Sequence, residues 1–314
     1  MKILSLGSRG FFGKNLVNAL RNTEHKIVAL SRREGLDLAD YDSTQSYLQA
    51  IKPGVIYNCA AHVGGLHYVA KLPADILTDN LLMSLNLYRA AQSVCPSVLI
   101  INPLSNCSYP GDRQLYRESE WLAGEVHPSV YSYGNAKRTL YTISRCYAMQ
   151  YGIKTYNFLV PNAFGAGDAT DPNKVHALNG MIIRMLESER QGLRQFEVWG
   201  TGTPIREWIY IDDVVALLIK ALGLDLDLLY PINLAQQQGY SIRESAALIA
   251  KAIGFEGEIV FRAEHQDGAP QKILDDRQFR RIFPDYRFAD PYRAICTTVE
   301  YYRSALEMPV LTPI

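Results

Sequence analysis

The chain opens with Met1-Lys-Ile-Leu-Ser-Leu-Gly7-Ser-Arg-Gly10-Phe-Phe-Gly13, a short apolar run followed by glycines at three-residue spacing. Residues 2–6 predict a strand, and an amphipathic stretch from about Phe12 to Arg21 predicts the following helix. Glycines at such a turn allow close approach of a pyrophosphate and packing of the helix on the strand. The spacing is G-x-x-G-x-x-G rather than G-x-G-x-x-G. The turn favours nucleotide binding over a plain strand–helix connection.

The residues after this turn alternate between apolar strands and helical patterns. Strands are predicted at 26–31, 55–60, 98–102 and 154–160, and helices at 43–51, 81–93 and 133–151. Alternation of this kind predicts an α/β fold with a Rossmann-type doubly wound parallel sheet. Ligands of such sheets bind at the carboxyl ends of the strands, where the glycine turn lies. A smaller, mostly C-terminal α/β substrate domain is expected to follow.

The composition of the 314-residue chain is that of a globular protein, 48% hydrophobic and 20% charged. Lys+Arg and Asp+Glu are both 32, so we expect neither nucleic acid nor a membrane as a partner. The five cysteines are scattered without metal-ligand spacing, which predicts no metal and a reduced, cytoplasmic setting. No apolar run approaches the roughly 20 residues that span a bilayer, and no secretory peptide is expected.

The second predicted strand ends in Ser31-Arg32-Arg33. An NAD-preferring site usually places an acidic residue here, which binds the ribose 2′-hydroxyl. Two arginines, together with Arg9 in the glycine turn, instead suit a 2′-phosphate because guanidinium forks match phosphate oxygens. The sequence therefore favours NADP(H), although a solvated surface pair of arginines is the alternative.

Tyr133 and Lys137 lie four residues apart, a spacing that puts both side chains on one face of a helix. A phenol has an unperturbed pKa of about 10, and a fixed ammonium favours its ionised form. We therefore expect Lys137 to lower the pKa of Tyr133, and Ser105 to hold a carbonyl or hydroxyl against the phenol. The set predicts proton transfer at an oxygen during hydride transfer, although the spacing alone arises by chance among 20 tyrosines.

With these motifs assembled, the chain resembles the extended short-chain dehydrogenase/reductase family, and within it the GDP-L-fucose synthase family. The resemblance covers nearly the whole chain. The motifs that carry it are Gly7–Gly13, Ala60-Ala-His-Val-Gly-Gly65, Pro73-Ala-Asp75 with Asn80, Ser105-Asn-Cys107-Ser-Tyr-Pro110, Tyr133-xxx-Lys137, Pro161-Asn162, His176, Arg184 and Val198-Trp-Gly-Thr-Gly-Thr-Pro-Ile-Arg206-Glu.

The resemblance implies catalytic roles for residues of these motifs. Ser105, Tyr133 and Lys137 would serve reduction of a ketone by NADPH. Cys107 and His176 would act as base and acid at the carbons that flank the ketone. An inert buried thiol and a structural histidine are the alternatives for these two residues.

Further contacts follow from the same resemblance and from the arginines above. Residues expected at the cofactor are Gly7, Arg9, Gly10, Phe11, Phe12, Gly13, Arg32, Arg33, Ala60, Ala61, Lys137, Pro161, Asn162 and His176. Residues expected at the substrate are Val63, Gly64, Gly65, Ser105, Asn106, Cys107, Tyr133, Asn162, Arg184, Trp199, Arg206 and Lys272. Surface positions for the arginines and a core position for Trp199 stay open.

The implied activity is NADPH-dependent 3,5-epimerisation and 4-keto reduction of a GDP-4-keto-6-deoxy sugar, carried out by a homodimer. An enzyme that only reduces or only epimerises another nucleotide-4-keto-sugar, hexose or heptose, is the alternative; a non-catalytic NADP-binding sensor is a further one. The implied NADP-binding domain comprises residues 1–162 and a return segment at about 207–231. The implied nucleotide-sugar domain comprises 163–206 and 232–314.

Two segments beside the expected sugar pocket depart from the synthase pattern. Gly165-Ala-Gly-Asp168 stands where the family carries Pro-His-Asp. Pro103 stands in a strand that the family ends with glycine, and we expect it to bend that strand end because proline removes a ladder donor. The exact sugar and nucleotide base therefore stay open.

Overall fold

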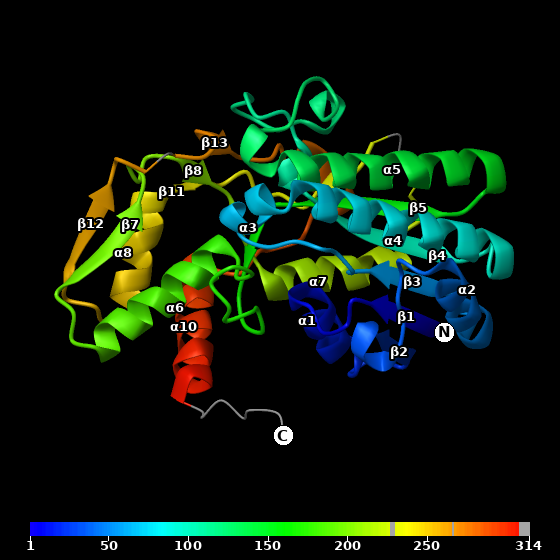
Figure 1. Cartoon of the computed structure of the whole chain (residues 1–314), viewed down its shortest axis with the longest axis horizontal. Helices are drawn as coiled ribbons and strands as arrows, with labels where there is room; N and C mark the ends of the chain where they lie inside the picture. The colour runs from blue at the N-terminus through cyan, green and yellow to red at the C-terminus, as the bar shows by residue number, and fades with distance from the viewer. Residues whose placement is uncertain (227–229, 266, 308–314) are drawn as a thin grey trace.

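The computed structural model describes residues 1–226, 230–265 and 267–307. Within them, a parallel six-stranded sheet has the order β10-β5-β4-β3-β1-β2 (Figure 1). Its strands are β1 (Lys2–Leu6), β2 (Lys26–Leu30), β3 (Val55–Asn58), β4 (Leu99–Ser105), β5 (Thr155–Val160) and β10 (Ile232–Asn233). The predicted Rossmann-type sheet is confirmed, and its order reverses between β1 and β3, where such sheets bind ligands.

Helices cover both faces of this sheet. One face carries α2 (Tyr41–Ile51), α4 (Pro73–Val94) and α5 (Tyr131–Tyr151), and the other carries α1 (Phe11–Leu20) and α7 (Ile211–Lys220) (Figure 1). Neighbouring residues of β3 belong to two different cores. Ile56 packs in the core under α2, α4 and α5, whereas Val55 and Tyr57 pack in the core under α1 and α7. Burial on both faces explains the continuous apolar strands of the sequence.

A second group of elements packs around its own core. It comprises α6 (Ala177–Arg190), β7 (Gln195–Trp199), α8 (Ile242–Ile253), β12 (Glu258–Arg262) and α10 (Pro291–Glu307). The predicted start of α8 is confirmed, because Ser241 and Glu244 form a reciprocal capping box. A small sheet of β11 (Tyr240–Ser241), β8 (Ile205–Arg206) and β13 (Gln271–Lys272) lies above these elements in Figure 1.

Strand β10 lies at the end of the predicted return segment, at about 207–231. It pairs in parallel with β5 through Ile232 and Asn233, just beyond the predicted boundary at residue 231. The sheet takes in these residues because they pair the edge that β5 would otherwise expose. The domain division stays a prediction, and residues 227–229, 266 and 308–314 lie outside the described residues.

Pro103 lies inside β4, and the strand continues past it to Ser105; the predicted bend of this strand end stays a prediction. Strand β4 stays paired with β5 as far as Ser105, whereas its pairing with β3 ends at Ile101. Backbone N–H groups alternate along a strand: that of Leu99 points to the β3 side, and that of Ile100 to the β5 side. Position 103 therefore faces Asn58 at the end of β3, where proline has no N–H to donate, and the β3–β4 pairing ends at Ile101.

A row of asparagines crosses the sheet just below its carboxyl edge. Asn58 of β3 donates to Asn102 of β4 at 3.0 Å, and Asn102 donates to Asn157 of β5 at 3.0 Å. Asn102 also donates to the Tyr88 hydroxyl, and Asn157 to the Ser144 hydroxyl, at 2.9 and 3.1 Å. These bonds satisfy amide groups that would be costly to bury alone.

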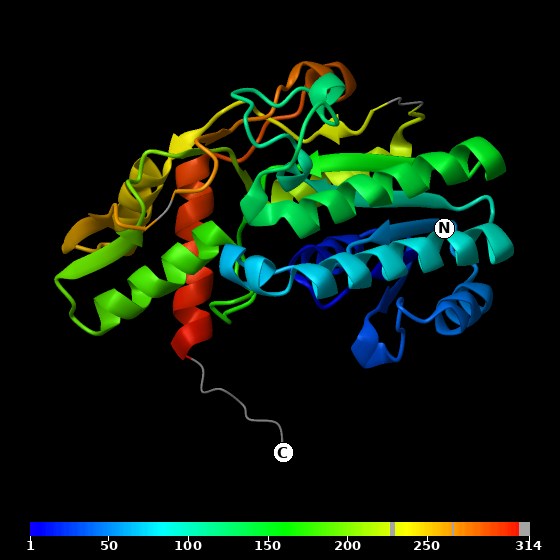
Figure 2. The same cartoon turned by 45° about the horizontal axis from the view of Figure 1, so that its top comes forward.

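Helix α3 (Leu66–Lys71) follows β3 in the chain and contacts the second group of elements, and Figure 2 shows it beside α6. Just before it, the Gly65 N–H donates to the Asn173 carbonyl at 2.8 Å. On α3 itself, the His67 ring meets the edge of Trp199 at the end of β7. Within the described residues, no helix combines the length and apolarity needed to cross a membrane.

Candidate active site

The glycine turn after β1 has space only for glycine at two positions. Gly7 has a φ of +68°, and a Cβ there would lie 2.7 Å from the Ala60 backbone. A Cβ on Gly13 would lie 2.2 Å from the Gly7 carbonyl oxygen. Helix α1 begins at Phe11 with Gly10 as its N-cap. The free N–H groups of this helix end can therefore face an anion at close range, as the sequence predicts.

A cavity of about 360 Å³ lies beside this turn and extends along the end of β2. Arg32 lines it together with Asp37, whereas Arg33 is not among its lining residues. Arg9 is exposed and forms an ion pair with Glu34 at 2.6 Å. Hydrogen bonds from Ser31 and Arg9 lower the pKa of Glu34. Of the predicted arginines, Arg32 is thus the one at the cavity wall, and Glu34 is a partner that the strand-end pattern did not reveal.

A second cavity, of about 210 Å³, contains every predicted catalytic residue in its wall. The two cavities share Gly10, Cys59 and Ala61, so they form a continuous groove across the carboxyl edge of the sheet. Other predicted residues in this second wall are Phe11, Phe12, Val63, Gly64, Asn106, Pro161 and Asn162, while Ala60 lines the first cavity. Gly65 lies beside this wall without lining it.

Tyr133 and Lys137 lie in the first turns of α5 and point toward the end of β4. The Lys137 ammonium lies 5.5 Å from the centre of the Tyr133 ring and 3.4 Å from the Pro103 carbonyl oxygen. Burial lowers the pKa of Lys137 to about 8. Burial and the nearby Cys107 raise the pKa of Tyr133. The predicted lowering of this pKa by Lys137 is therefore wrong. Both side chains are thus desolvated, and Lys137 can lose a proton near neutrality.

Strand β4 ends in a tight turn that presents Ser105 and Cys107. The Ser105 hydroxyl accepts a hydrogen bond from the Cys107 N–H at 3.2 Å, which fixes both residues at the pocket wall. Between them, Asn106 is 2% exposed and its side-chain nitrogen has no hydrogen-bond partner within the described residues. A buried amide donor at a cavity wall suits a ligand oxygen, and the role of Asn106 at the substrate stays a prediction.

His176 is the N-cap of α6, and its ring packs against Phe11 with centroids 5.1 Å apart. Its Nδ1 lies 3.0 Å from the carboxylate of Asp168, which also accepts from the His176 N–H and from Asn179. Burial opposes ionisation of Asp168, but these hydrogen bonds outweigh it and lower its pKa. Asp168 therefore orients the imidazole and leaves Nε2 for the pocket. The carboxylate after the glycines at 165 and 167 was the only sequence signal for this role.

The predicted substrate residues of the second group of elements lie at different places. Arg206 and Lys272 pair as neighbours in β8 and β13, and the Lys272 ammonium lies 3.7 Å from the Cys107 sulfur. Trp199 is 55% exposed and stacks on His265 at 4.7 Å. Arg184 lines a separate surface depression between α6 and β7, away from the catalytic cavity.

This arrangement agrees with comparisons to known proteins. The model of the NAD dependent epimerase/dehydratase family matches residues 3–227. The chain belongs to this family. Within the epimerase/dehydratase family, the chain is similar to a probable GDP-L-fucose synthase of Drosophila melanogaster, with 32% identity over 96% of this chain and 97% of that protein.

Two further relatives agree with this assignment. GDP-L-fucose synthase of Escherichia coli is 30% identical over 90% of each chain. The solved structure of a GDP-L-fucose synthetase from Naegleria fowleri bound to NADP has a TM-score of 0.89 and 27% identity, over 98% of this chain and 93% of that chain. These relatives are similar to nearly the whole chain, so the similarity includes both the sheet and the elements around the second cavity.

Proposed function

We propose that this chain catalyses NADPH-dependent 3,5-epimerisation and 4-keto reduction of a GDP-4-keto-6-deoxy sugar. The observation that carries the proposal is one cavity lined by Ser105, Tyr133 and Lys137 together with Cys107 and His176. Simple oxidation of an alcohol needs the first three residues, but has no use for an additional base and acid. The names and coverage of the relatives support a GDP-sugar as the substrate.

The groove fits NADP(H). Gly7 and Gly13 leave room for a pyrophosphate at the start of α1, because a Cβ at either position would collide with backbone. Arg32 at the end of β2 lines the far cavity, where a 2′-phosphate would be held by its guanidinium. Lys137, Pro161 and the ring of Phe12 line the near cavity. When bound there, NADPH supplies a hydride for the C4 carbon of the sugar.

Epimerisation uses the acidity of the hydrogens that flank a C4 ketone. The Cys107 thiolate takes a proton from the carbon, the C–H electron pair moves into an enolate, and Ser105 and Tyr133 donate hydrogen bonds to the enolate oxygen. His176, oriented by Asp168, returns a proton from the opposite face. For the reduction, Tyr133 donates its proton to the C4 oxygen and Lys137 replaces it.

The proposal is tested with purified protein, NADPH and GDP-4-keto-6-deoxymannose in deuterium oxide. We expect oxidation of NADPH, measured by absorbance, together with deuterium at the carbons that flank C4, measured by mass spectrometry and NMR. Exchange without oxidation would indicate an epimerase, and oxidation without exchange a reductase. The absence of both with every 4-keto nucleotide-sugar would contradict a catalytic role.

We propose a homodimer formed through the outer faces of α4 and α5. Large apolar side chains are exposed on these faces: Leu82 and Leu85 on α4, and Met149 and Tyr151 on α5. Their burial in a helical bundle would remove apolar surface from water. Sedimentation velocity should give a dimer, and Leu85→Glu should give a monomer.

We also propose a cytoplasmic location, because all five cysteines are free. Cell fractionation tests this location.

A further inference from the structure

Lys272 has an unusual partner for a buried lysine. Its side chain is largely enclosed, with the residue 8% exposed, and its ammonium lies 3.7 Å from the sulfur of Cys107. Within the described residues it forms no ion pair with a carboxylate. A buried ammonium is costly unless a group of opposite charge or a strong acceptor lies beside it. The thiolate form of Cys107 would meet this need directly.

The backbone around Lys272 is held from two sides. On one side, the Lys272 carbonyl accepts from the Glu207 N–H at 3.0 Å, and the Glu207 carboxylate accepts from the Leu274 N–H at 2.8 Å. On the other side, the Tyr116 N–H donates to the Ile273 carbonyl at 2.8 Å. The position of the ammonium is therefore set by backbone pairing rather than by the flexible side chain alone.

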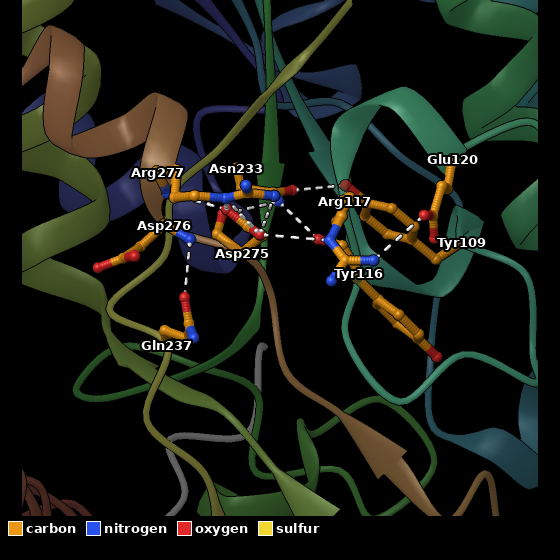
Figure 3. Close-up of polar contacts among 9 residues, drawn as sticks. All are labelled: Tyr109, Tyr116, Arg117, Glu120, Asn233, Gln237, Asp275, Asp276 and Arg277. Carbon is orange, nitrogen blue, oxygen red and sulfur yellow. Dashed lines mark hydrogen bonds and ion pairs between the residues drawn. The ribbon is translucent and has the colours of Figure 1, made fainter.

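A polar network secures the Tyr116 side of this arrangement (Figure 3). The Asn233 side chain donates to the Tyr116 and Asp275 carbonyls at 2.9 and 3.1 Å. The Asp275 carboxylate pairs with Arg117 at 3.6 Å and with Arg277 at 2.8 Å. The segment that follows Cys107 is thus tied to the segment that carries Lys272, although the two residues are 165 positions apart.

Three other titratable groups in the described part of the chain interact electrostatically with Cys107, and none of them is negatively charged near pH 7. They are Tyr133 from α5, Tyr116 from the loop after β4, and Arg206 from β8. Burial raises the pKa of both tyrosines, which keeps them neutral near pH 7. Burial, Lys272 and Arg206 lower the pKa of His127 close by, which is consistent with a cationic surrounding. The Cys107 sulfur therefore has the Lys272 ammonium 3.7 Å away as a neighbouring cationic group.

We propose that Lys272 is a positioning residue that holds Cys107 as the thiolate and keeps its sulfur aimed into the catalytic cavity. The inference rests on the proposed function, in which this thiolate takes a proton from the sugar. As the S–H bond forms, the C–H electron pair passes to the enolate, and the Lys272 ammonium keeps its own protons. The thiol proton is lost to solvent before the next proton abstraction, at the second carbon or in the next turnover, a step that Lys272 favours again.

The test is alkylation of Cys107 in the full-length protein by iodoacetamide, from about pH 5 to about pH 9, followed by mass spectrometry of its peptide. In Lys272→Met we expect the rate at neutral pH to fall about tenfold, because the reacting sulfur loses the ammonium that lies 3.7 Å away. Lys272→Arg should restore most of the rate. Lys154→Met, which removes a surface lysine, and alkylation of the exposed Cys146 are the controls.

Deuterium exchange into the GDP-4-keto sugar gives the second measurement. Lys272→Met should lower the turnover of exchange and move its pH profile to higher pH, with a smaller change in KM. A raised KM with unchanged alkylation would mean that Lys272 binds the diphosphate, and would overturn the inference. If wild-type protein acts on no 4-keto sugar while Lys272 still controls alkylation, the proposed function fails but the pairing stands. Lys272→Gln replaces the methionine variant if the latter does not fold.

Discussion

The two ends of the catalytic cavity are built in different ways. Tyr133, Lys137 and Ser105, expected to act in reduction, come from β4 and the helix α5 that follows it in the chain. Cys107, expected to act in proton exchange, depends on Lys272, which a separate small sheet brings across 165 positions. The residues for reduction thus come from the Rossmann sheet and its helix, whereas proton exchange requires both groups of elements to be in place.

The largest effect is expected from Tyr133→Phe. The phenol is the proton donor to the C4 oxygen, so its loss should lower the rate of NADPH oxidation about 10³-fold. Tyr131→Phe changes an exposed residue in the same helical turn and is the matched control. Stopped-flow absorbance with GDP-4-keto-6-deoxymannose measures both. A loss of less than tenfold would contradict the role of Tyr133 as the proton donor in reduction.

Cys107→Ser should separate the two chemistries. A serine hydroxyl is a much weaker base than a thiolate, so deuterium exchange should fall at least about 10²-fold. Reduction of a sugar that has already been epimerised should change far less. Cys146→Ser, an exposed position on α5, is the control. Equal loss of exchange and reduction would show that the two ends of the cavity act as one unit.

Arg32→Ala tests the proposed contact between Arg32 and the 2′-phosphate of NADPH. Loss of one charge-assisted contact to phosphate should raise the KM for NADPH by about tenfold or more, with little change for NADH. Arg33→Ala is matched in charge, but Arg33 does not line the cavity, so its effect should be smaller. Steady-state kinetics with both cofactors measure the difference. An equal response of the two variants would contradict the assignment of Arg32.

The smallest effect concerns Glu207, the buried carboxylate at the junction of the two groups of elements. Burial raises its pKa to about 7, against the pull of backbone N–H groups from Leu274, Gln236 and Gln237. The folded state therefore binds a proton more tightly than the unfolded state. The corresponding stability is full below the unfolded pKa and is lost as the pH rises through 7.

Glu207→Gln removes this titration. The unfolding temperature of the wild type, relative to the variant, should fall by about 5 °C between pH 5 and pH 8. Differential scanning calorimetry at both pH values measures this difference, and its dependence on pH is independent of any constant cost of the substitution. A difference that does not change with pH would show that Glu207 is ionised throughout in the folded protein.

The sequence was most informative where a pattern depends on neighbours along the chain. The glycine turn, the apolar strands and the four-residue step from Tyr133 to Lys137 are local, and the structure confirms the elements that carry them. The partners of Arg9 and Lys272 depend on packing between distant segments, so residue types alone could not predict them. The loss of a ladder donor at Pro103 was predictable from the residue type, but which neighbouring strand loses the bond depends on the register.

The row formed by Asn58, Asn102 and Asn157 also bears on how related chains can diverge. The central amide of Asn102 accepts from Asn58 and donates to Asn157, so replacement of Asn102 alone leaves groups on two other strands without partners. A slip of one residue in any of the three strands would break the same row. The three positions are thus expected to covary, and homologous sequences that lack one should have altered the others.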